Sequence, residues 1–399
     1  MTASRPTILQ VIPRLETGGA EQTTIDMVDA LVKAGARALV VTEGGRMAAA
    51  VAGHGGEIVP MPVASKNPAR VLWNSRIMAA LCRREGVNLI HARSRAPAWS
   101  GLLAARRLKL PFVTTYHGAY GGTSALKTWY NGVMARGDVV IANSAYTARL
   151  ISARHQTPAD KIRVIPRGVD LVRFDPAAVA PDRVAGLRAR WGVRSGQPVV
   201  LNAARLTDWK GQRVLIEAAG ILARQGRLGD AVVVLAGDAQ GRDGYVAELQ
   251  TRIADLGLGG RVVLGGHCDD MPAAFLASAV SVIASTEPEA FGRVATESLA
   301  LGTPVIATDL GAPPETLAAS TRLGWLVPAG DAAALAAALA EVLAMQAEAR
   351  AAFATAARAH VAAGFSLGRM QADTLAVYDR LLGTAYFTLS PSFTERELG

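Results

Sequence analysis

The sequence predicts an α/β protein made of two doubly wound parallel sheets, and three observations lead to this prediction. Short apolar, β-branched runs alternate with stretches of helical periodicity, which is typical of parallel strands joined by helices. The alternation stops between Pro166 and Pro198, in a stretch rich in proline, glycine and charge, and then begins again. The chain has 399 residues, which is too long for one ordinary core and favours two domains of roughly 150–200 residues.

The first alternation lies in residues 1–175, which we predict to form the N-terminal domain. Its apolar runs are short and β-branched, as buried parallel strands are. We expect strands at Ile8–Ile12, Ala38–Thr42, Glu57–Met61, Val87–His91, Phe112–Tyr116, Val139–Ala142 and Ile162–Ile165. Periodic stretches between them predict helices at Glu21–Ala34, Pro68–Arg84 and Ala98–Lys109.

The second alternation lies in residues 176–364, and Pro166–Pro198 is interpreted as the linker that leads into it. We expect strands at Val199–Ala203, Val232–Ala236, Val262–Leu264, Val280–Ala284 and Val305–Thr308. The alanine-rich stretch Asp331–Ala363 predicts a helix with Asp331 as its N-cap. Phe365–Leu382 predicts a last helix, and with the tail it makes up residues 365–399.

Composition and charge restrict the class of protein. The only two cysteines, Cys82 and Cys268, lie far apart in the sequence, which indicates a reducing compartment. We see no signal peptide. We also see no uncharged apolar window of about 18 residues, the length that a membrane-spanning helix needs. Residues 1–175 hold 23 Lys and Arg against 11 Asp and Glu, whereas the remainder holds 19 against 22. We therefore expect a cytoplasmic protein whose basic first half contacts an anionic membrane surface or acceptor, above all through Lys66–Lys109. The alternative is a genomic bias toward arginine, since Arg outnumbers Lys 36 to 6, and no pattern favours nucleic acid.

The stretch Glu287–Ala300 carries the strongest chemical signal. It places Glu289 and Glu297 around the start of a helix that follows the buried apolar run Ala279–Ser285. Backbone N–H groups and the helix dipole at such a helix start favour a phosphate. Ionised carboxylates accept hydrogen bonds from several sugar hydroxyls. The pattern therefore predicts a nucleotide-sugar as the ligand.

Two cations follow the first strand of the second alternation. Arg205 and Lys210 come directly after Val199–Ala203, and ligands of open α/β sheets bind beyond the carboxyl ends of the strands. A pyrophosphate gains negative charge as its bond to the sugar breaks, so cations here would favour the transition state. Two cations on a surface loop are usually only solvated, and it is the Glu289 loop that favours a function. Gly237, at the next strand end, is expected to line the base pocket of the nucleotide.

The first half carries two further candidates at strand ends. Adjacent glycines ending in Gly19 open the first helix and allow close approach of a ligand to the backbone, although a simple β–α turn explains them equally well. His117 ends a strand before a loop with Gly121 and Gly122, which favours contact with the transferred sugar over a structural role. His91 closes the preceding strand in the same manner. No metal-ligand pattern is visible, so we expect neither a metal nor another cofactor, and cations and helix N–H groups would neutralise the diphosphate.

These motifs resemble those of the GT-B glycosyltransferases of family 4, retaining enzymes that use nucleotide-diphospho-sugars. The resemblance covers essentially the full length and is carried by Gly18–Glu21, Tyr116–Gly118, Val164–Asp170 with Phe174, Arg205–Gly211 and Glu289–Glu297. It implies two Rossmann-like domains that face each other across a cleft, with the last helix returning to the first domain. One departure is Arg167, where the family often carries asparagine.

The resemblance also implies roles for the candidate residues. Glu289 would contact the donor sugar hydroxyls and Glu297 the ribose, while His117 would lie beside the reacting sugar. The backbone amides of Phe291, Gly292, Arg293 and Val294 would join Arg205 and Lys210 on the diphosphate, and Gly19 is a further predicted donor ligand. The family reaction is front-face attack by the acceptor, in which the departing phosphate helps to deprotonate the incoming hydroxyl and no protein nucleophile is needed.

More narrowly, three segments resemble lipopolysaccharide-core mannosyltransferases that use GDP-mannose. They are His91–Trp99, Lys127–Arg136 and Pro288–Arg293. This implies an anionic, lipid-linked saccharide as acceptor, with Arg93 and Arg95 as predicted acceptor ligands. The alternatives are another hexosyl or N-acetylhexosaminyl transferase of the family, an epimerase or phosphorylase of the same fold, a glycoside hydrolase, and a non-catalytic nucleotide-sugar-binding protein. The oligomeric state stays open.

Overall fold

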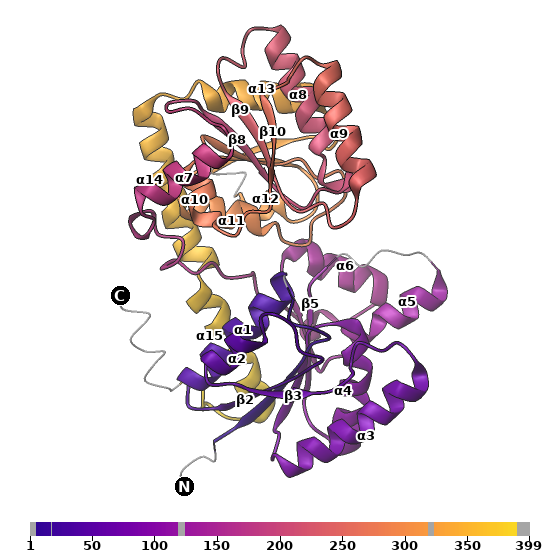
Figure 1. Cartoon of the computed structure of the whole chain (residues 1–399). Coiled ribbons are helices and arrows are strands. Elements are labelled where there is room, and N and C mark those ends of the chain that lie inside the picture. Colours follow the sequence, from indigo (N-terminus) through magenta and orange to yellow (C-terminus); the bar gives the residue numbers. More distant parts are fainter. Residues whose placement is uncertain (1–4, 17, 119–123, 318–322, 389–399) are drawn as a thin grey trace. The chain divides into compact units, whose positions relative to one another are not determined.

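A computed structural model describes residues 5–16, 18–118, 124–317 and 323–388 and divides the chain into two compact units. The first unit consists of the chain up to Gly168 together with the residues from Leu367 onward, and the second is Val169–Ser366. Each unit contains one parallel sheet with helices on both faces (Figure 1), which confirms the α/β prediction. The boundary expected between residues 175 and 176 falls inside the second unit.

The sheet of the first unit has seven parallel strands in the order β3-β2-β1-β4-β5-β6-β7. The strands are β1 (Thr7–Val11), β2 (Arg37–Thr42), β3 (Glu57–Pro60), β4 (Leu89–Ala92), β5 (Phe112–Tyr116), β6 (Val139–Ala142) and β7 (Ile162–Val164). The helices are α1 (Gly19–Lys33), α2 (Ala48–Gly53), α3 (Pro68–Arg84), α4 (Arg95–Leu108), α5 (Ala125–Asn131), α6 (Ala145–His155) and α15 (Leu367–Leu382).

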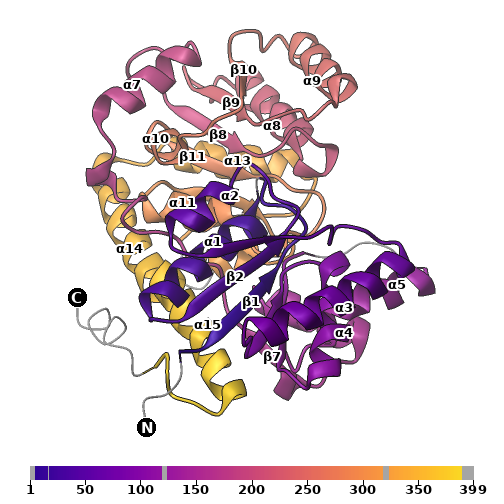
Figure 2. The ribbon, with the colours of Figure 1, turned by 60° about the horizontal axis from the view of Figure 1, so that its bottom comes forward.

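Successive strand residues of this sheet pack into two separate cores. Side chains alternate between the faces of a strand, so Leu9 packs with residues of α3 and α4, whereas Ile8 packs with residues of α1 and α15. Figure 2 shows α3 and α4 together on one side of this sheet. The last helix is tied to this unit by Gln371, whose side-chain amide donates to the Asp26 carbonyl at 2.7 Å.

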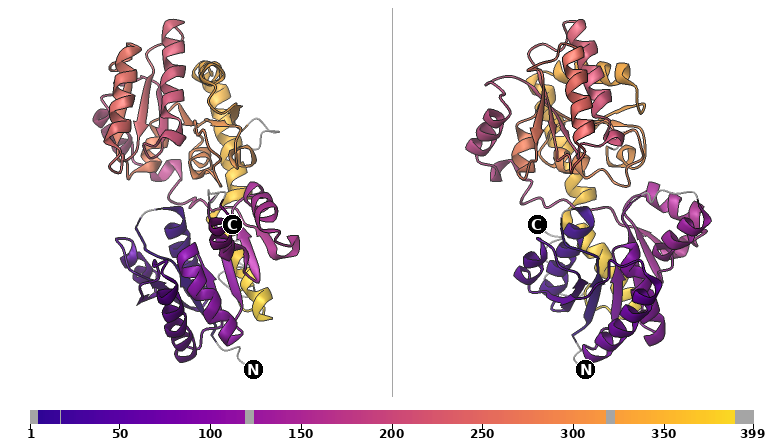
Figure 3. Two further views of the ribbon diagram at one scale, coloured as in Figure 1. Left: turned by 90° about the vertical axis from the view of Figure 1, so that its right-hand side faces the viewer. Right: turned by 45° about the vertical axis from the view of Figure 1, so that its right-hand side comes forward.

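The sheet of the second unit has six parallel strands in the order β10-β9-β8-β11-β12-β13. The strands are β8 (Val199–Ala203), β9 (Val232–Ala236), β10 (Val262–Gly266), β11 (Val280–Ile283), β12 (Val305–Thr308) and β13 (Trp325–Val327). The helices are α7 (Pro181–Arg190), α8 (Gln212–Arg224), α9 (Asp243–Asp255), α10 (Met271–Leu276), α11 (Arg293–Ala300), α12 (Pro313–Thr316), α13 (Ala332–Leu343) and α14 (Ala347–Phe365). Val199 faces the core with α10, α11 and α14, and Val200 faces the core with α8, α9 and α13; the resulting layers are visible in Figure 3.

Most of Pro166–Pro198 is not a linker, which corrects the sequence interpretation. The stretch contains α7, and Leu187 and Trp191 are buried in a core of the second unit. A segment rich in proline and charge resembles a linker in sequence. It has too few apolar residues to show the helical period that would reveal a buried helix face.

Two other elements differ from expectation. The helix predicted over Asp331–Ala363 is two helices, α13 and α14, which meet at an angle of 106°. Strand β13 was not predicted, because three residues are too few to show a period. In the described part of the chain, no single helix is long and apolar enough to cross a membrane, and α13 with α14 pass that test only as a bent pair.

Candidate functional site

Two neighbouring strands of the second unit bring the predicted donor residues together. Strands β8 and β11 pair in parallel, and the loops that follow them carry Lys210 and Glu289. Gly211 makes the contact between the loops possible. Its φ is 70°, and a Cβ at this position would collide with the Ala284 carbonyl. The Thr286 amide also donates to the Trp209 carbonyl at 2.8 Å, so the two loops are joined through their backbones.

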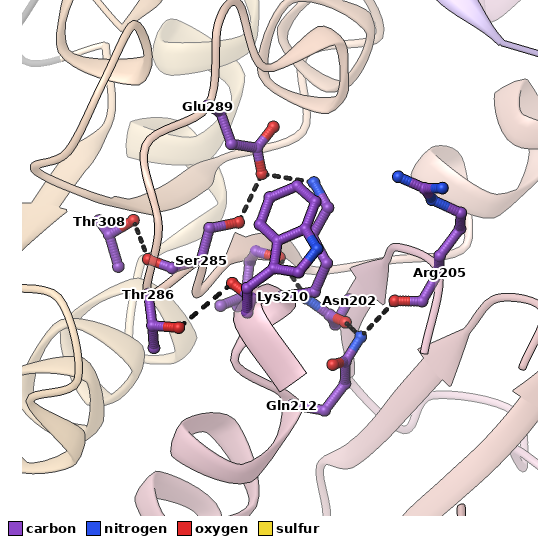
Figure 4. A network of polar contacts seen from close by, with 10 residues as sticks. Asn202, Arg205, Lys210, Gln212, Ser285, Thr286, Glu289 and Thr308 are labelled. Atoms are coloured by element: carbon purple, nitrogen blue, oxygen red, sulfur yellow. Dashed lines mark hydrogen bonds and ion pairs between the residues drawn. The ribbon is translucent and has the colours of Figure 1, made fainter. Parts of the chain in front are cut away.

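Lys210 and Glu289 form a mostly buried ion pair. The Lys210 Nζ lies 2.6 Å from Glu289 Oε1, and the two side chains are 16% and 13% exposed. The Ser285 hydroxyl donates to the same carboxylate oxygen at 2.5 Å (Figure 4). Lys210 Nζ also lies 4.3 Å from the centre of the Trp209 ring. The carboxylate is thus fixed by two donors on one oxygen, and its second oxygen is available to other partners such as sugar hydroxyls.

Arg205 is fixed by its backbone, while its side chain reaches solvent. Its carbonyl accepts from the Gln212 side chain at 3.0 Å, and Gln212 also donates to Asn202 Oδ1 at 3.3 Å. Figure 4 shows the guanidinium extending to the same side as the Lys210 ammonium. In residues 5–16, 18–118, 124–317 and 323–388, no acidic side chain pairs with it. Two cations therefore follow β8. Lys210 is paired with Glu289, whereas Arg205 has no acidic partner among the described residues.

The start of α11 has the form expected of a phosphate-binding turn. Gly292 is its N-cap, with φ 81° and no side-chain capping bond. The Phe291 ring is buried 6.1 Å from the ring of Phe365, so only its backbone can face a ligand. Glu297 is buried, and its Oε1 lies 2.6 Å from a guanidinium nitrogen of Arg293 one turn away. Val294 is half-buried in the same turn.

Gly237 lies at the same edge of the sheet, where only a residue without a side chain fits. It follows β9, and a Cβ there would collide with the Ala204 carbonyl, so the loops after β8 and β9 pack closely only with glycine. Its predicted role in the base pocket stays a prediction.

His117 and Gly19 meet through Arg167 in the first unit. Arg167 lies against the backbone of Gly19, where any Cβ would collide with the guanidinium. A second nitrogen of that guanidinium donates to His117 Nδ1 at 3.1 Å. Burial, with the charges of Arg167 and Arg93, holds the pKa of His117 well below its usual 6.5. His117 is therefore neutral at pH 7, and because Arg167 only donates, the imidazole proton resides on Nε2. Gly121 and Gly122 lie outside the described residues.

The structure corrects the placement of Arg93. The charge pattern puts it on a basic surface, but it is 2% exposed, and its guanidinium donates to Gln10 Oε1 at 3.0 and 2.6 Å. Arg93 directly follows β4 and its side chain turns inward, which a count of charges along the sequence does not reveal. Arg95 is half-buried and donates to Asn131 Oδ1 at 2.9 Å.

His91 has a structural position. It is completely buried, with Nδ1 2.6 Å from the Tyr378 hydroxyl and Nε2 2.7 Å from the Thr115 hydroxyl. Both ring nitrogens thus have partners inside the first unit, and burial holds the pKa of His91 well below 6.5.

Several polar residues that complete the two sites were not predicted. Trp209 contacts Lys210, Ser285 contacts Glu289, Gln212 holds the Arg205 carbonyl, and Asn143 lies near His117. Their common signal is a polar residue at, or a few positions after, the end of an apolar strand. In the part of the chain that the structure describes, no three His, Cys, Asp or Glu side chains form a group that could hold a metal ion.

Comparison with known protein families gives two matches that together span both units. Residues 17–173 match the model described as Glycosyltransferase Family 4, and residues 185–360 match the model described as Glycosyl transferases group 1. The chain belongs to glycosyltransferase family 4. A crystal structure of a glycosyltransferase from Rickettsia africae is 32% identical, with a TM-score of 0.88 over 95% of this chain and 99% of that chain. The GT-B fold expected from the resemblance is thereby confirmed.

Other relatives differ in what their names say they bind. HepE from Anabaena in complex with UDP has a TM-score of 0.81 and 25% identity, over 94% of this chain and 100% of that chain. A GDP-mannose-dependent phosphatidylinositol monomannoside mannosyltransferase from Mycolicibacterium smegmatis is 32% identical over 61% of this chain and 64% of its own length. Three D-inositol 3-phosphate glycosyltransferases are matched over 57%, 52% and 60% of their length, so the chain spans little more than half of these curated relatives.

Proposed function

We propose that this family 4 protein is a retaining glycosyltransferase that moves a hexose from a nucleotide-diphospho-sugar to a lipid-linked or lipopolysaccharide-core saccharide. The observation that carries the proposal is the Lys210–Glu289 pair, with Nζ and Oε1 2.6 Å apart, beside Arg205 and the glycine-capped start of α11. Cations and backbone amides suit a diphosphate, and a fixed carboxylate suits sugar hydroxyls. A hydrolase would need two carboxyl groups flanking one glycosidic bond, whereas Glu297 is buried and paired with Arg293.

In the proposed reaction the acceptor hydroxyl attacks the anomeric carbon as the bond to the diphosphate oxygen breaks. The proton of that hydroxyl passes to the departing phosphate, so the protein provides no nucleophile. Arg205, Lys210 and the α11 amides stabilise the negative charge that develops on the leaving group, which is worth more in the transition state than in the ground state. Glu289 holds the sugar in place. In this proposal neither a metal ion nor another cofactor takes part.

GDP-mannose is the first candidate for the donor. It is supported by the segments that resemble lipopolysaccharide-core mannosyltransferases and by the GDP-mannose-dependent mycobacterial relative. The UDP complex of HepE supports a UDP-hexose as the second candidate. The alternative function, a protein that binds a nucleotide-sugar without turnover, would use the same donor site.

A lipid-linked acceptor is supported by one face of the first unit, which we call the α3–α5 face. Most exposed large apolar side chains of the described residues lie on it, namely Leu72, Trp73, Ile77, Leu103, Leu126 and Trp129. The same stretch of chain also carries exposed basic residues, namely Lys66, Arg70, Arg76, Arg83, Arg107 and Lys127. Exposed aromatic and apolar groups among cations are typical of proteins that lie on an anionic bilayer.

The three helices of this face are packed together. The Ser100 hydroxyl of α4 donates to the Val71 carbonyl of α3 at 3.2 Å. The ring centres of Trp99 on α4 and Trp129 on α5 lie 4.6 Å apart with the rings tilted by 30°, and the Arg136 guanidinium lies 5.0 Å from the centre of the Trp99 ring. The proposal therefore places the protein at the inner face of the cytoplasmic membrane.

A donor panel tests the proposal directly. Thermal unfolding is followed with GDP-mannose, UDP-glucose, UDP-galactose and UDP-N-acetylglucosamine, because a ligand that binds the native state raises the melting temperature. The donor that stabilises the protein is then incubated with membrane-extracted saccharides, and the anomeric configuration of the product is read by NMR. Failure of every nucleotide-sugar to stabilise the protein would refute the donor site, and stabilisation without transfer would favour the binding protein.

A further inference from the structure

The first unit contains an open pocket beside the end of α5, at the border of the α3–α5 face. Its walls come from α5, from the short 3-10 helix Gly132–Ala135 that follows it, and from the end of α6. The lining residues are Thr128, Trp129, Gly132, Ala135, Arg136 and His155. The pocket has a volume of about 190 Å³, whereas one water needs only about 10–15 Å³. It can therefore hold a ligand of several non-hydrogen atoms.

This pocket is separate from the residues assigned to the donor. Arg136 comes just before β6, and His155 ends the helix that leads to the start of β7, so both lie toward the amino ends of the strands. Ligands of open α/β sheets bind beyond the carboxyl ends. The lining residues all belong to the first unit, whereas Lys210 and Glu289 belong to the second. The pocket would therefore bind a ligand other than the donor.

Arg136 brings a guanidinium to this pocket, and two tryptophan rings orient it. The group lies 5.0 Å from the centre of the Trp99 ring and 5.6 Å from the centre of the Trp129 ring. Indole rings at this distance attract a guanidinium by cation–π interaction. Within residues 5–16, 18–118, 124–317 and 323–388, neither a carboxylate nor another acceptor pairs with it. Its N–H donors are therefore available to a ligand.

The other polar groups of the pocket also suit an anion, and none of the six described lining side chains is a carboxylate. The half-buried Thr128 hydroxyl has no hydrogen-bond partner among the residues that the structure describes. The Nε2 atom of His155 lies 3.4 Å from the Tyr116 hydroxyl. Burial, with the positive charges of Arg154 and Arg136, holds the pKa of His155 below 6.5. The pocket therefore offers hydrogen-bond donors in a positive potential.

We propose that this pocket binds the phosphate of an anionic lipid headgroup while the α3–α5 face lies on the bilayer. A phosphate presents several negatively charged acceptor oxygens, which match a guanidinium fork and a hydroxyl donor. A neutral sugar would find no carboxylate there to accept hydrogen bonds from its hydroxyls. The inference rests on the proposed function only for the position of the protein at a membrane.

The surroundings of the pocket favour a lipid over a soluble phosphate. Trp129 borders the pocket and is 54% exposed, and Leu126, one turn earlier on α5, is 76% exposed. Residues three positions apart lie on the same side of a helix. Acyl chains attached to a phosphate in the pocket would therefore meet apolar side chains, and tryptophan is enriched where bilayers meet water.

The test compares two kinds of phosphatidylcholine vesicle with equal surface potential, one made anionic by phosphatidic acid and the other by oleate. Both attract the basic first unit equally, but only phosphatidic acid adds an anionic phosphate. Sedimentation of the full-length protein should show about tenfold tighter binding to the phosphatidic acid vesicles, the size expected for a hydrogen-bonded pair of charged groups. Equal binding of the wild type to both kinds would overturn the inference.

Three variants locate the preference. Arg136→Lys keeps the charge but loses the planar fork, so it should bind both kinds of vesicle equally, as tightly as the wild type binds oleate vesicles. Thr128→Val removes the hydroxyl and should also reduce the preference. The matched control is Arg107→Gln, which removes an exposed cation outside the pocket. It should weaken binding to both kinds about fivefold and keep the preference. A full preference in Arg136→Lys would overturn the inference.

Glycerol 3-phosphate distinguishes a headgroup from a soluble phosphate. At constant ionic strength we expect it to reduce binding to phosphatidic acid vesicles and to leave binding to oleate vesicles unchanged. If calorimetry shows Arg136-dependent binding of glycerol 3-phosphate while the wild type has no preference between the vesicles, the headgroup assignment is wrong. If nucleotide-sugars fail to bind while the Arg136-dependent preference persists, the proposed function falls and the headgroup pocket stands. Sugar transfer without that preference would give the reverse result.

Discussion

Lys210 and Glu289 touch each other, yet the proposed function gives them different partners. We expect Lys210→Ala to weaken binding of GDP or UDP alone and to lower kcat about 10²–10³-fold, because it removes a charge that stabilises the leaving group. Glu289→Ala should lower transfer as strongly but leave binding of the bare nucleoside diphosphate unchanged, since its proposed partner is the sugar. Titration calorimetry with nucleotide and with nucleotide-sugar, together with initial rates, separates the two roles.

The control for both variants is Arg213→Ala. Arg213 forms exposed ion pairs with Asp208 and Glu248 in the same unit. We expect its loss to leave binding and rate near the wild-type values, since exposed ion pairs contribute about 0–1 kcal/mol. Full transfer activity in either Lys210→Ala or Glu289→Ala would exclude that residue from the reaction.

His91 makes the stability of the protein depend on pH. Its pKa is held well below 6.5 by burial, so below about pH 6.5 the unfolded chain binds a proton that the folded chain does not. The free energy of unfolding should therefore fall as the pH drops from 7.5 to 5.5, by up to about 1.4 kcal/mol per pH unit for this residue. Urea unfolding of wild type and His91→Gln at both values measures the difference.

The informative quantity in that experiment is the slope and not the stability itself, because His91→Gln also disturbs the bonds to Tyr378 and Thr115. We expect His91→Gln to reduce the pH dependence of the free energy of unfolding. The control is His267→Gln, which replaces an exposed histidine and should leave that pH dependence unchanged. An identical slope in wild type and His91→Gln would contradict the prediction.

The turn that starts α8 decides how closely the loops after β8 and β11 pack. Gly211 and Gly226 flank the two ends of α8, and both have positive φ, 70° and 67°. Only at Gly211 would a Cβ meet another backbone, that of Ala284, whereas nothing lies within 4 Å at Gly226. Gly226→Ala should cost about 1–2 kcal/mol for the backbone conformation. Gly211→Ala should cost about 1–3 kcal/mol more, because the loops must separate.

Donor binding extends this comparison. We expect Gly211→Ala to weaken nucleotide-sugar binding, because separated loops no longer hold Lys210 against Glu289, and Gly226→Ala to bind like the wild type. Chemical denaturation and calorimetry on the two variants provide both measurements. Equal losses of stability in the two would show that the Gly211–Ala284 contact does not fix the loops.

The charge of the whole molecule and the α3–α5 face together predict where the protein lies in the cell. We expect binding to phosphatidylcholine vesicles only when they contain phosphatidylglycerol, and release at about 1 M salt, where the screening length is about 3 Å. Arg70→Gln and Arg76→Gln should each weaken binding about fivefold, corresponding to about 1 kcal/mol per charge. Vesicle sedimentation measures these affinities.

The apolar part of this face is tested separately. Trp73→Ser combined with Leu126→Ser removes two side chains that are more than half exposed, so folding should be retained and vesicle binding lost. Val172→Ser removes a still more exposed apolar side chain from the second unit and is the matched control. Unchanged vesicle binding by the double variant would argue against the α3–α5 face.

The sequence by itself determined every described strand except β13, the parallel arrangement of the strands, and the loops that carry the donor residues. Strands such as Phe112–Tyr116 and Val199–Ala203 have the bounds that were predicted, because burial on both faces leaves a short β-branched run between polar turns. The same pattern failed for Trp191 and α7, where the apolar residues are few and their partners are far away in sequence.

Only the tertiary structure decided which side chains meet. Lys210 and Glu289 are 79 positions apart, and their contact depends on β8 and β11 being neighbours in the sheet. The buried positions of Arg93 and Asn143 likewise depend on how the strand ends pack against α1 and α15. A sequence records which groups follow each strand, whereas the order of the strands and the packing of the helices fix the direction in which those groups point.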